Sequence, residues 1–306
     1  MKRWQADGLL LAVAMIWGLA FVPQAWGMEH LGPMAFTGLR FALGALVVAP
    51  LAWREHQRNA LFERTHGRPV SSGLARPGPP RWVLLAGLGL LIFLGAALQQ
   101  IGLVTTSVTN AGFLTALYVP GVPLLAWAIF GRRPHPVVWP AALGCVAGTW
   151  LLTGAQPVAI ASGDWWVIAS SLPWALHVVL VGWAAGRLGA PYTVAGVQFA
   201  VCSALSLLVA AFTESIGWGA VQAAAGAIAY TGLVSVGVGY TAQVVAQRHT
   251  READAALLLS SETVFAALFG ALLAGDRLTP QGWAGCAVIL GCIVAAQLVP
   301  LWGRVR

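Results

Sequence analysis

The feature that most constrains this chain is a series of long apolar segments separated by short polar ones. A helix that spans a bilayer needs about 20 mostly apolar residues, and ten segments of this kind can be found. Strands of a membrane barrel would be about half as long and would alternate apolar with polar residues. We therefore expect an all-α membrane protein with spans at residues 8–28, 34–53, 82–104, 108–130, 136–154, 164–185, 191–213, 220–246, 254–274 and 280–302.

Charge is scarce and is sorted to one side. Only 9% of the residues are charged, against about 25% in soluble domains. If the chain starts in the cytoplasm, its cytoplasmic segments hold 15 of the 17 Lys and Arg residues. Cytoplasmic loops carry this excess, so we expect a multi-pass protein of the cell (inner or plasma) membrane with both termini cytoplasmic. The first apolar run is expected to be retained as a span, since a signal peptide would have a shorter one. Topology also explains the net charge of +7, so no nucleic-acid partner is invoked.

An internal repeat relates the two halves of the chain. Residues match at a spacing of 157–158 early in the halves and at 144 later, and the segment 54–81, present only in the first half, accounts for the change. The matched pairs are Asp7 with Asp164, Trp17 with Trp174, Pro33 with Pro191, Arg40 with Gln198, Gly95 with Gly239 and Gln99 with Gln243.

Each half contains five predicted spans, and an odd number inserts the second half upside down. We expect two inverted five-helix repeats, at residues 1–154 and 155–306, with a flexible cytoplasmic loop at 54–81. Inverted repeats recur in secondary transporters, with the substrate site near the midplane between them. Alternating access follows if the two halves exchange conformations.

Three motifs resemble the EamA-type transporters of the drug/metabolite transporter superfamily. They are the Trp17-Gly18 pair, the Arg40-Phe41 pair and the segment GDRLTPQGWAGCAVILG at 275–291. The family usually has glutamate where this chain has Asp276. The resemblance implies a ten-helix protein that moves small metabolites and often exports amino acids, including aromatic ones. It also implies a pathway lined by the first, third and fourth helices of each half.

Glu262 is the most informative polar residue, because a charge at the bilayer centre costs about 2.5–3.5 kcal/mol on insertion scales. We expect it to face the interior and to bind a substrate ammonium, a coupling proton, or each in turn. The alternative is a hydrogen bond to a neighbouring helix. Tyr118 is its repeat partner, Trp17 and Trp174 lie at a similar depth, and His177 can pair with Glu262 to hold or release a proton.

Other polar residues extend this site. Gln99 and Gln243, with Gln100 and Tyr240, are expected to line the two vestibules, although interhelical hydrogen bonding explains amides equally well. Arg40 is expected to anchor its helix by snorkelling, ahead of binding substrate. The candidate substrate-binding residues are Trp17, Gln99, Tyr118, Trp174, His177, Tyr240, Gln243 and Glu262.

Three further sequence features bear on structure. Asn110 and Asp254 stand near the starts of the fourth and ninth spans and are expected to be N-caps. The Gly144–Gly148 GxxxG motif predicts a close helix contact or a homodimer face. The four cysteines form no CxxC or Cys/His cluster, so we expect no metal.

The leading functional prediction is a secondary active transporter, acting as an exporter of small metabolites such as amino acids. An intramembrane enzyme is one alternative, but GxSxG, HExxH and paired aspartates are not found, so we predict no catalytic residues. A passive channel is the other. No nucleotide-binding GxxxxGK[ST] stretch occurs, and no cofactor is expected. The expected partners are the lipid bilayer and a neutral or zwitterionic small molecule.

Overall fold

The chain folds as a bundle of helices. The computed structural model describes residues 1–66, 79–106, 108–152, 162–269 and 279–302, together with Val70 and Leu272, and all regular elements in these ranges are helical. They are α1 (Arg3–Met28), α2 (Pro33–His66), α3 (Arg81–Leu103), α4 (Val108–Thr115), α5 (Tyr118–Phe130), α6 (Val138–Leu152), α7 (Ser162–Leu188), α8 (Pro191–Thr213), α9 (Trp218–Ala223), α10 (Ala225–Ala229), the π-helix η1 (Tyr230–Tyr240), α11 (Thr241–Gln247), α12 (Glu252–Leu259), α13 (Glu262–Phe269) and α14 (Pro280–Trp302).

Eight helical stretches within the described ranges are long and apolar enough to cross a membrane. Two of the ten predicted spans fall short of that length. Helix α6 has only 15 residues, and the predicted span at 254–274 is interrupted between α12 and α13, with its last part outside the described residues. The helical, multi-pass character predicted from sequence is therefore present, while length alone supports fewer spans.

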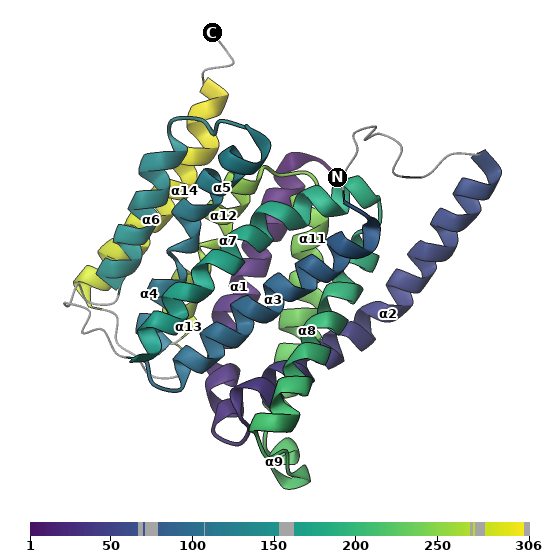
Figure 1. Cartoon of the computed structure of the whole chain (residues 1–306). Helices are drawn as coiled ribbons and strands as arrows, with labels where there is room; N and C mark the ends of the chain where they lie inside the picture. The colour runs from purple at the N-terminus through teal and green to yellow at the C-terminus, as the bar shows by residue number, and fades with distance from the viewer. Residues whose placement is uncertain are drawn as a thin grey trace.

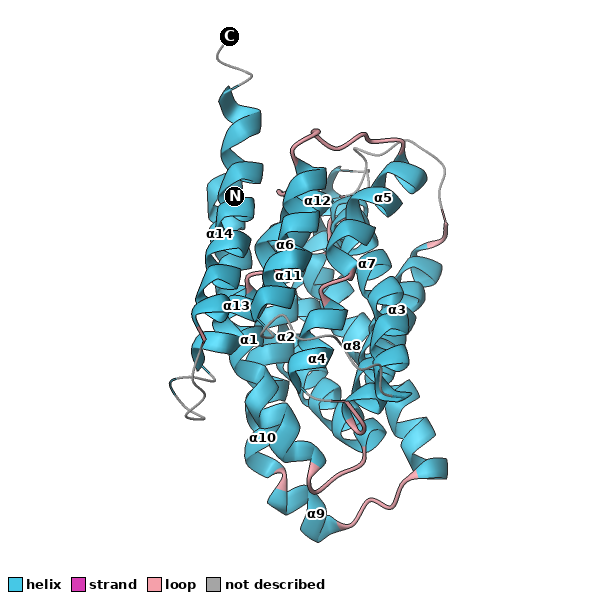
Figure 2. Cartoon of the chain, turned by 90° about the vertical axis from the view of Figure 1, so that its left-hand side faces the viewer, coloured by secondary structure: helices cyan, strands magenta, loops and turns pink. Residues whose placement is uncertain are grey.

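Helices far apart in the sequence pack side by side. In Figure 1, α6 and α14 lie together on one flank and α2 lies on the other, and α1 begins at the same end of the bundle at which α14 approaches its C-terminus. The turned view of Figure 2 shows α9 and α10 at the opposite end. Helix α2 packs on α8, α3 on α7, α5 on α12 and α6 on α14. Each of these contacts joins the first half of the chain to the second.

Helices α2 and α8 are antiparallel and cap each other. The carboxylate of Glu55, on α2, accepts hydrogen bonds from the backbone N–H groups of Tyr192 and Thr193 at the start of α8, at 3.3 and 2.7 Å. Glu214, at the end of α8, accepts from Met34 and Ala35 at the start of α2, at 2.8 Å each. Both carboxylates satisfy helix N-termini that would otherwise be unpaired.

The GxxxG motif belongs to a contact inside the molecule. A Cβ atom placed on Gly148 of α6 would lie 2.8 Å from the carbonyl oxygen of Gly285 on α14, and one on Gly285 would lie 2.4 Å from that of Gly148. Neither residue can therefore carry a side chain while the backbones stay this close. Of the two predicted roles for Gly144–Gly148, the structure shows the close helix contact.

The prediction of a flexible loop over 54–81 is wrong for its first half. Helix α2 continues to His66. Residues 54–66, REHQRNALFERTH, contain neither glycine nor proline, and most are good helix formers. The apolar run of this span ends near Trp53, but a helix can extend beyond the lipid with polar residues. Most of 67–78 lies outside the described residues.

Two spans are broken at equivalent places. The break between α4 and α5 lies at 116–117, and the break between α12 and α13 lies at 260–261, which is the repeat spacing of 144. In the first, Pro120 has no N–H to donate to the carbonyl of Ala116. In the second, the hydroxyls of Ser260 and Ser261 donate to backbone carbonyls three residues earlier, each at 2.6 Å. Such side-chain bonds compete with the helix.

Candidate substrate pocket

A central cavity collects the residues predicted from sequence. Its empty space amounts to about 650 Å³, a figure that includes open space at its mouth. All eight candidate residues line it. The full lining, from α1 to α13, is Trp17, Ala20, Phe21, Gln24, Arg40, Gln99, Thr115, Tyr118, Trp174, His177, Val178, Ser235, Tyr240, Gln243, Leu259 and Glu262.

The lining repeats itself. Twelve of the sixteen residues form six pairs that are separated by one of the two main repeat spacings, 157 or 144. Gln24, Arg40, Ser235 and Tyr240 have no such partner. The pairs are Trp17 with Trp174, Ala20 with His177, Phe21 with Val178, Gln99 with Gln243, Thr115 with Leu259, and Tyr118 with Glu262.

Tyr240 is the centre of an aromatic wall. Its ring centroid lies 4.5 Å from that of Trp17 and 6.2 Å from that of Trp174. Glycines allow both tryptophans to approach: a Cβ on Gly239 would lie 2.8 Å from Trp17 Nε1, and one on Gly95 would lie 2.8 Å from the Trp174 ring. Tyr240 is also the last residue of η1, and π-helices often occur at functional sites.

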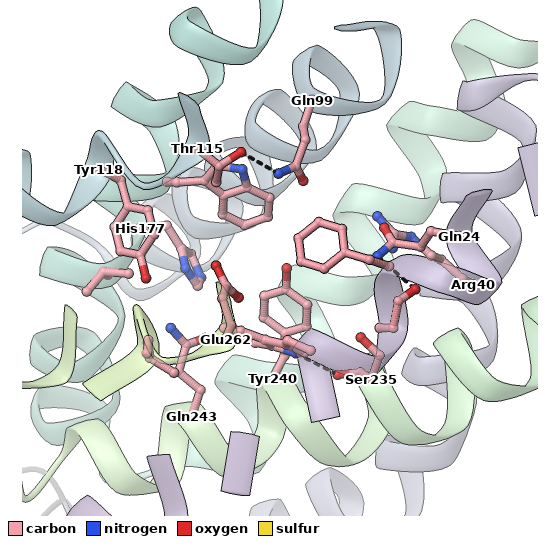
Figure 3. Close-up of a pocket in the computed structure, with 16 residues that line it drawn as sticks. Gln24, Arg40, Gln99, Thr115, Tyr118, His177, Ser235, Tyr240, Gln243 and Glu262 are labelled. Atoms are coloured by element: carbon pink, nitrogen blue, oxygen red, sulfur yellow. Dashed lines mark hydrogen bonds between the residues drawn. The ribbon is translucent and has the colours of Figure 1, made fainter. Parts of the chain in front are cut away.

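Glu262 is the first residue of α13 and lines the cavity. Figure 3 shows its carboxylate pointing between His177 and Tyr240. A helix N-terminus favours a negative charge, so the break before α13 gives this carboxylate a suitable position at the middle of the bundle. In the described part of the chain, no cation forms an ion pair with it and no group donates a hydrogen bond to it.

His177 pairs with Gln198 and not with Glu262. Its Nε2 lies 3.1 Å from Gln198 Oε1, and because a carbonyl oxygen only accepts, Nε2 is the donor. The predicted Glu262–His177 pair is therefore not formed in this structure, although both residues line the same cavity.

The glutamines divide between the cavity and the helix packing. Gln99 donates to Thr115 Oγ1 at 2.8 Å, while Gln243 is buried in the cavity wall. Gln100, predicted to line a vestibule, is wholly buried outside the cavity, and its amide contacts Met28 Sδ at 3.2 Å. Successive residues on a helix face about 100° apart, so Gln99 and Gln100 cannot share one wall.

Arg40 also lies in the cavity wall and does not snorkel. It is 5% exposed, and its Nη1 donates to Gln24 Oε1 at 2.5 Å. Gln24 was not among the residues predicted from sequence, and it follows Trp17 by seven residues on α1. Two helical turns put both residues on one face, so the seven-residue spacing of this amide from Trp17 was the sequence signal that could have identified Gln24 as a cavity residue.

Polar contacts join the helices at the start of α1, and we interpret this as the closed end of the cavity. There Arg3 Nη2 lies 2.8 Å from Asp254 Oδ2 and 3.1 Å from Gln297 Oε1, and Thr250 Oγ1 donates to Asp7 at 2.8 Å. The prediction that Asp254 is an N-cap is wrong: Arg251 is the N-cap of α12, and Asp254 is the third residue of that helix and an ion-pair partner. Asn110 is likewise the third residue of α4, inside the helix.

Space continues toward the other end of α1. A second cavity of about 670 Å³, again including open space, is lined by Phe21 together with Ala25, Met28, Glu29, Leu103 and Val104. Phe21 lines both cavities. At this end Thr106 is hydrogen-bonded to Asp164, the repeat counterpart of the Thr250–Asp7 bond.

A cavity with charged and amide side chains inside an apolar helical bundle, next to broken helices, is the arrangement found in multi-pass membrane transporters. The chain belongs to the EamA-like transporter family, whose model matches it twice, over residues 4–154 and 161–296. An uncharacterized transporter of Archaeoglobus fulgidus is 27% identical over 97% of this chain and 87% of its own length. The uncharacterized transporter YwfM of Bacillus subtilis is 24% identical over 95% and 93%. A solved protein structure shares the fold, with a TM-score of 0.77 at 19% identity over 98% of both chains.

Proposed function

We propose that this transporter is a secondary active exporter of small metabolites that carry an amine, such as amino acids, and that Glu262 binds the amine and a coupling proton in turn. The observation that carries the proposal is the Glu262 carboxylate, which faces the cavity without a protein counter-ion among the described residues. A charge at this depth needs a partner, and an ammonium group or a proton supplies one.

Competition for one carboxylate explains coupling. If a proton and an ammonium group exclude each other at Glu262, a proton entering from one side releases the substrate, and a substrate entering from the other side releases the proton. The aromatic wall of Trp17, Trp174 and Tyr240 supports an organic cation next to this carboxylate, since ring faces attract cations.

Alternating access is supported by the repeat-related lining. We infer ten membrane crossings in two inverted halves, 1–154 and 155–306, with both termini in the cytoplasm. Exchange of the two halves would map the cavity largely onto itself, because six pairs of its lining residues are repeat-related. The Thr250–Asp7 and Thr106–Asp164 bonds are then equivalent contacts at the two ends, one set accompanied by the Arg3–Asp254 ion pair.

Counterflow in proteoliposomes tests the function. Vesicles loaded with an unlabelled amino-acid mixture should take up a labelled amino acid from outside. Each labelled amino acid is tested separately, with and without an imposed pH gradient. Glu262→Gln should abolish both uptake and its dependence on the gradient, because the amide neither holds a proton nor pairs with an ammonium. Glu63→Gln, at an exposed position on α2, is the matched control and should transport normally.

The two alternatives give different results. A channel would pass single-channel-sized currents and show no counterflow, and an enzyme would convert the labelled compound. Normal pH-dependent counterflow by the Glu262→Gln protein would refute the role given to this carboxylate.

A further inference from the structure

Arg40 and Gln24 are two of the four cavity-lining residues, with Ser235 and Tyr240, that have no repeat partner in the lining. The position matched to Arg40 in the second half is Gln198, which pairs with His177. The cavity therefore has a fixed positive charge on one side only, so the two halves of the cavity are chemically different.

The guanidinium of Arg40 is buried and only partly satisfied. Its Nη1 donates to Gln24, and its Nε, also buried, has no hydrogen-bond partner. Within the described ranges no carboxylate forms an ion pair with it, whereas Arg3 has two such partners and Arg132 has one. A buried charge without a counter-ion is strongly unfavourable, which indicates that an anionic group completes this site.

Two aromatic rings hold the guanidinium in place. Its Cζ lies 5.7 Å from the Phe36 ring centroid and 5.3 Å from that of Phe41. Ring faces attract a cation without using its N–H groups, so these contacts orient Arg40 and leave donors free. An arginine fork with free donors matches a planar carboxylate.

The second charged group stands across the cavity. Figure 3 shows Arg40 with Gln24 on one side of Tyr240 and Glu262 on the other. Tyr240 lines the same cavity as both charged groups. The two charges lack counter-ions within the described chain and have opposite signs, so a ligand with one cationic and one anionic group neutralises both.

We propose that Arg40, oriented by Gln24, binds the carboxylate of a zwitterionic substrate while Glu262 binds its ammonium group. This inference rests on the proposed function and adds to it a second recognition point. It excludes simple amines as preferred substrates, because an amine without a carboxylate leaves Arg40 buried and without a counter-ion.

Three probes that share a benzyl group separate the two charges: phenylalanine, 2-phenylethylamine and 3-phenylpropanoate. Equilibrium binding of each radiolabelled probe to the full chain in nanodiscs is the measurement. The wild type should bind phenylalanine at least tenfold more tightly than either of the others. Arg40→Gln should weaken phenylalanine binding by about 10- to 100-fold, the range for a lost charge-assisted hydrogen bond, and leave phenylethylamine binding unchanged.

Matched variants make the outcome specific. Arg58→Gln, the same substitution at an exposed position of α2, should behave as wild type. Glu262→Gln should lose both amine-bearing probes. If Arg40→Gln does not fold, Arg40→Lys is the test variant, because lysine keeps the charge but loses the paired N–H donors of the guanidinium. Arg40→Lys should weaken phenylalanine binding by severalfold and leave phenylethylamine binding unchanged.

Two results overturn the inference in different ways. If wild type binds both amine-bearing probes and the Arg40 variants leave their affinity ratio unchanged, the carboxylate site is wrong and the proposed function stands. If wild type binds none of the three probes saturably, both the proposed amino-acid substrate class and this inference are refuted.

Discussion

The ion pair at the closed end makes a quantitative prediction about conformation. Arg3 and Asp254 join α1 to α12 at 2.8 Å, with side chains 39% and 9% exposed. Exposed pairs contribute about 0.2–1 kcal/mol, whereas breaking a buried pair costs about 3–5 kcal/mol. Because Arg3 is more than one-third exposed, solvent screens the pair, and we expect Arg3→Gln to weaken the closure by about 1–2 kcal/mol. That is roughly a 5- to 30-fold larger population of molecules open at this end.

Thiol accessibility measures this population. Leu10 lies two helical turns after Arg3 on α1 and is fully buried. Leu10→Cys, in a chain whose four native cysteines are replaced by alanine, should therefore report opening at this end. Purified protein should react with a polar maleimide 5- to 30-fold faster when Arg3→Gln is added. Arg64→Gln, at an exposed position of α2, should leave the rate unchanged.

A double-mutant cycle tests the reasoning. Arg3→Gln and Asp254→Asn remove the same contact, so the double variant should label little faster than either single variant. Additive effects would show that the residues act separately. An unchanged rate in both single variants would refute the assignment of this pair as a closing contact.

Two further predictions concern stability in detergent, measured by thermal unfolding. Gly285→Ala should destabilise the protein by about 1–3 kcal/mol, as overpacking does, because the new Cβ meets the Gly148 backbone. Gly291→Ala on the same helix, with open space around it, should not destabilise the protein. Equal melting temperatures of the two variants would contradict the α6–α14 packing. Glu55→Gln should lower the stability by about 1–2 kcal/mol, the range for a lost helix cap, because the glutamine amide places donors against the N–H groups of α8. Glu63→Gln should have little effect on stability. A similar loss of stability in both variants would show that charge and not capping matters.

Apolar length and repeat spacing carry most of what the sequence predicts. They place Trp17, Tyr118 and Trp174 at one level with Glu262, and these residues do line one cavity. The sequence also predicts family membership through Trp17-Gly18 and Arg40-Phe41, and the family match bears this out.

Other features depend on contacts that no local pattern reveals. Arg40 faces the cavity because Gln24 of another helix is there to accept from it, so a snorkelling rule based on depth misplaces it. His177 finds Gln198 and not Glu262 for the same reason. The breaks at 116–117 and 260–261 had a visible signal in Pro120 and in the Ser260-Ser261 pair, but only the local hydrogen bonds show that the helices stop there.

The reciprocal carboxylate caps on α2 and α8 impose an order on biogenesis. When the ribosome has made only the first half, the amide groups of Met34 and Ala35 still lack Glu214, and Glu55 has no helix start to hold. The partners of Glu55 lie 137 and 138 residues later in the chain, and Glu214 lies 180 and 179 residues after Met34 and Ala35, so α2 is made well before these contacts can form. Both caps can form only once α8 has been made and inserted.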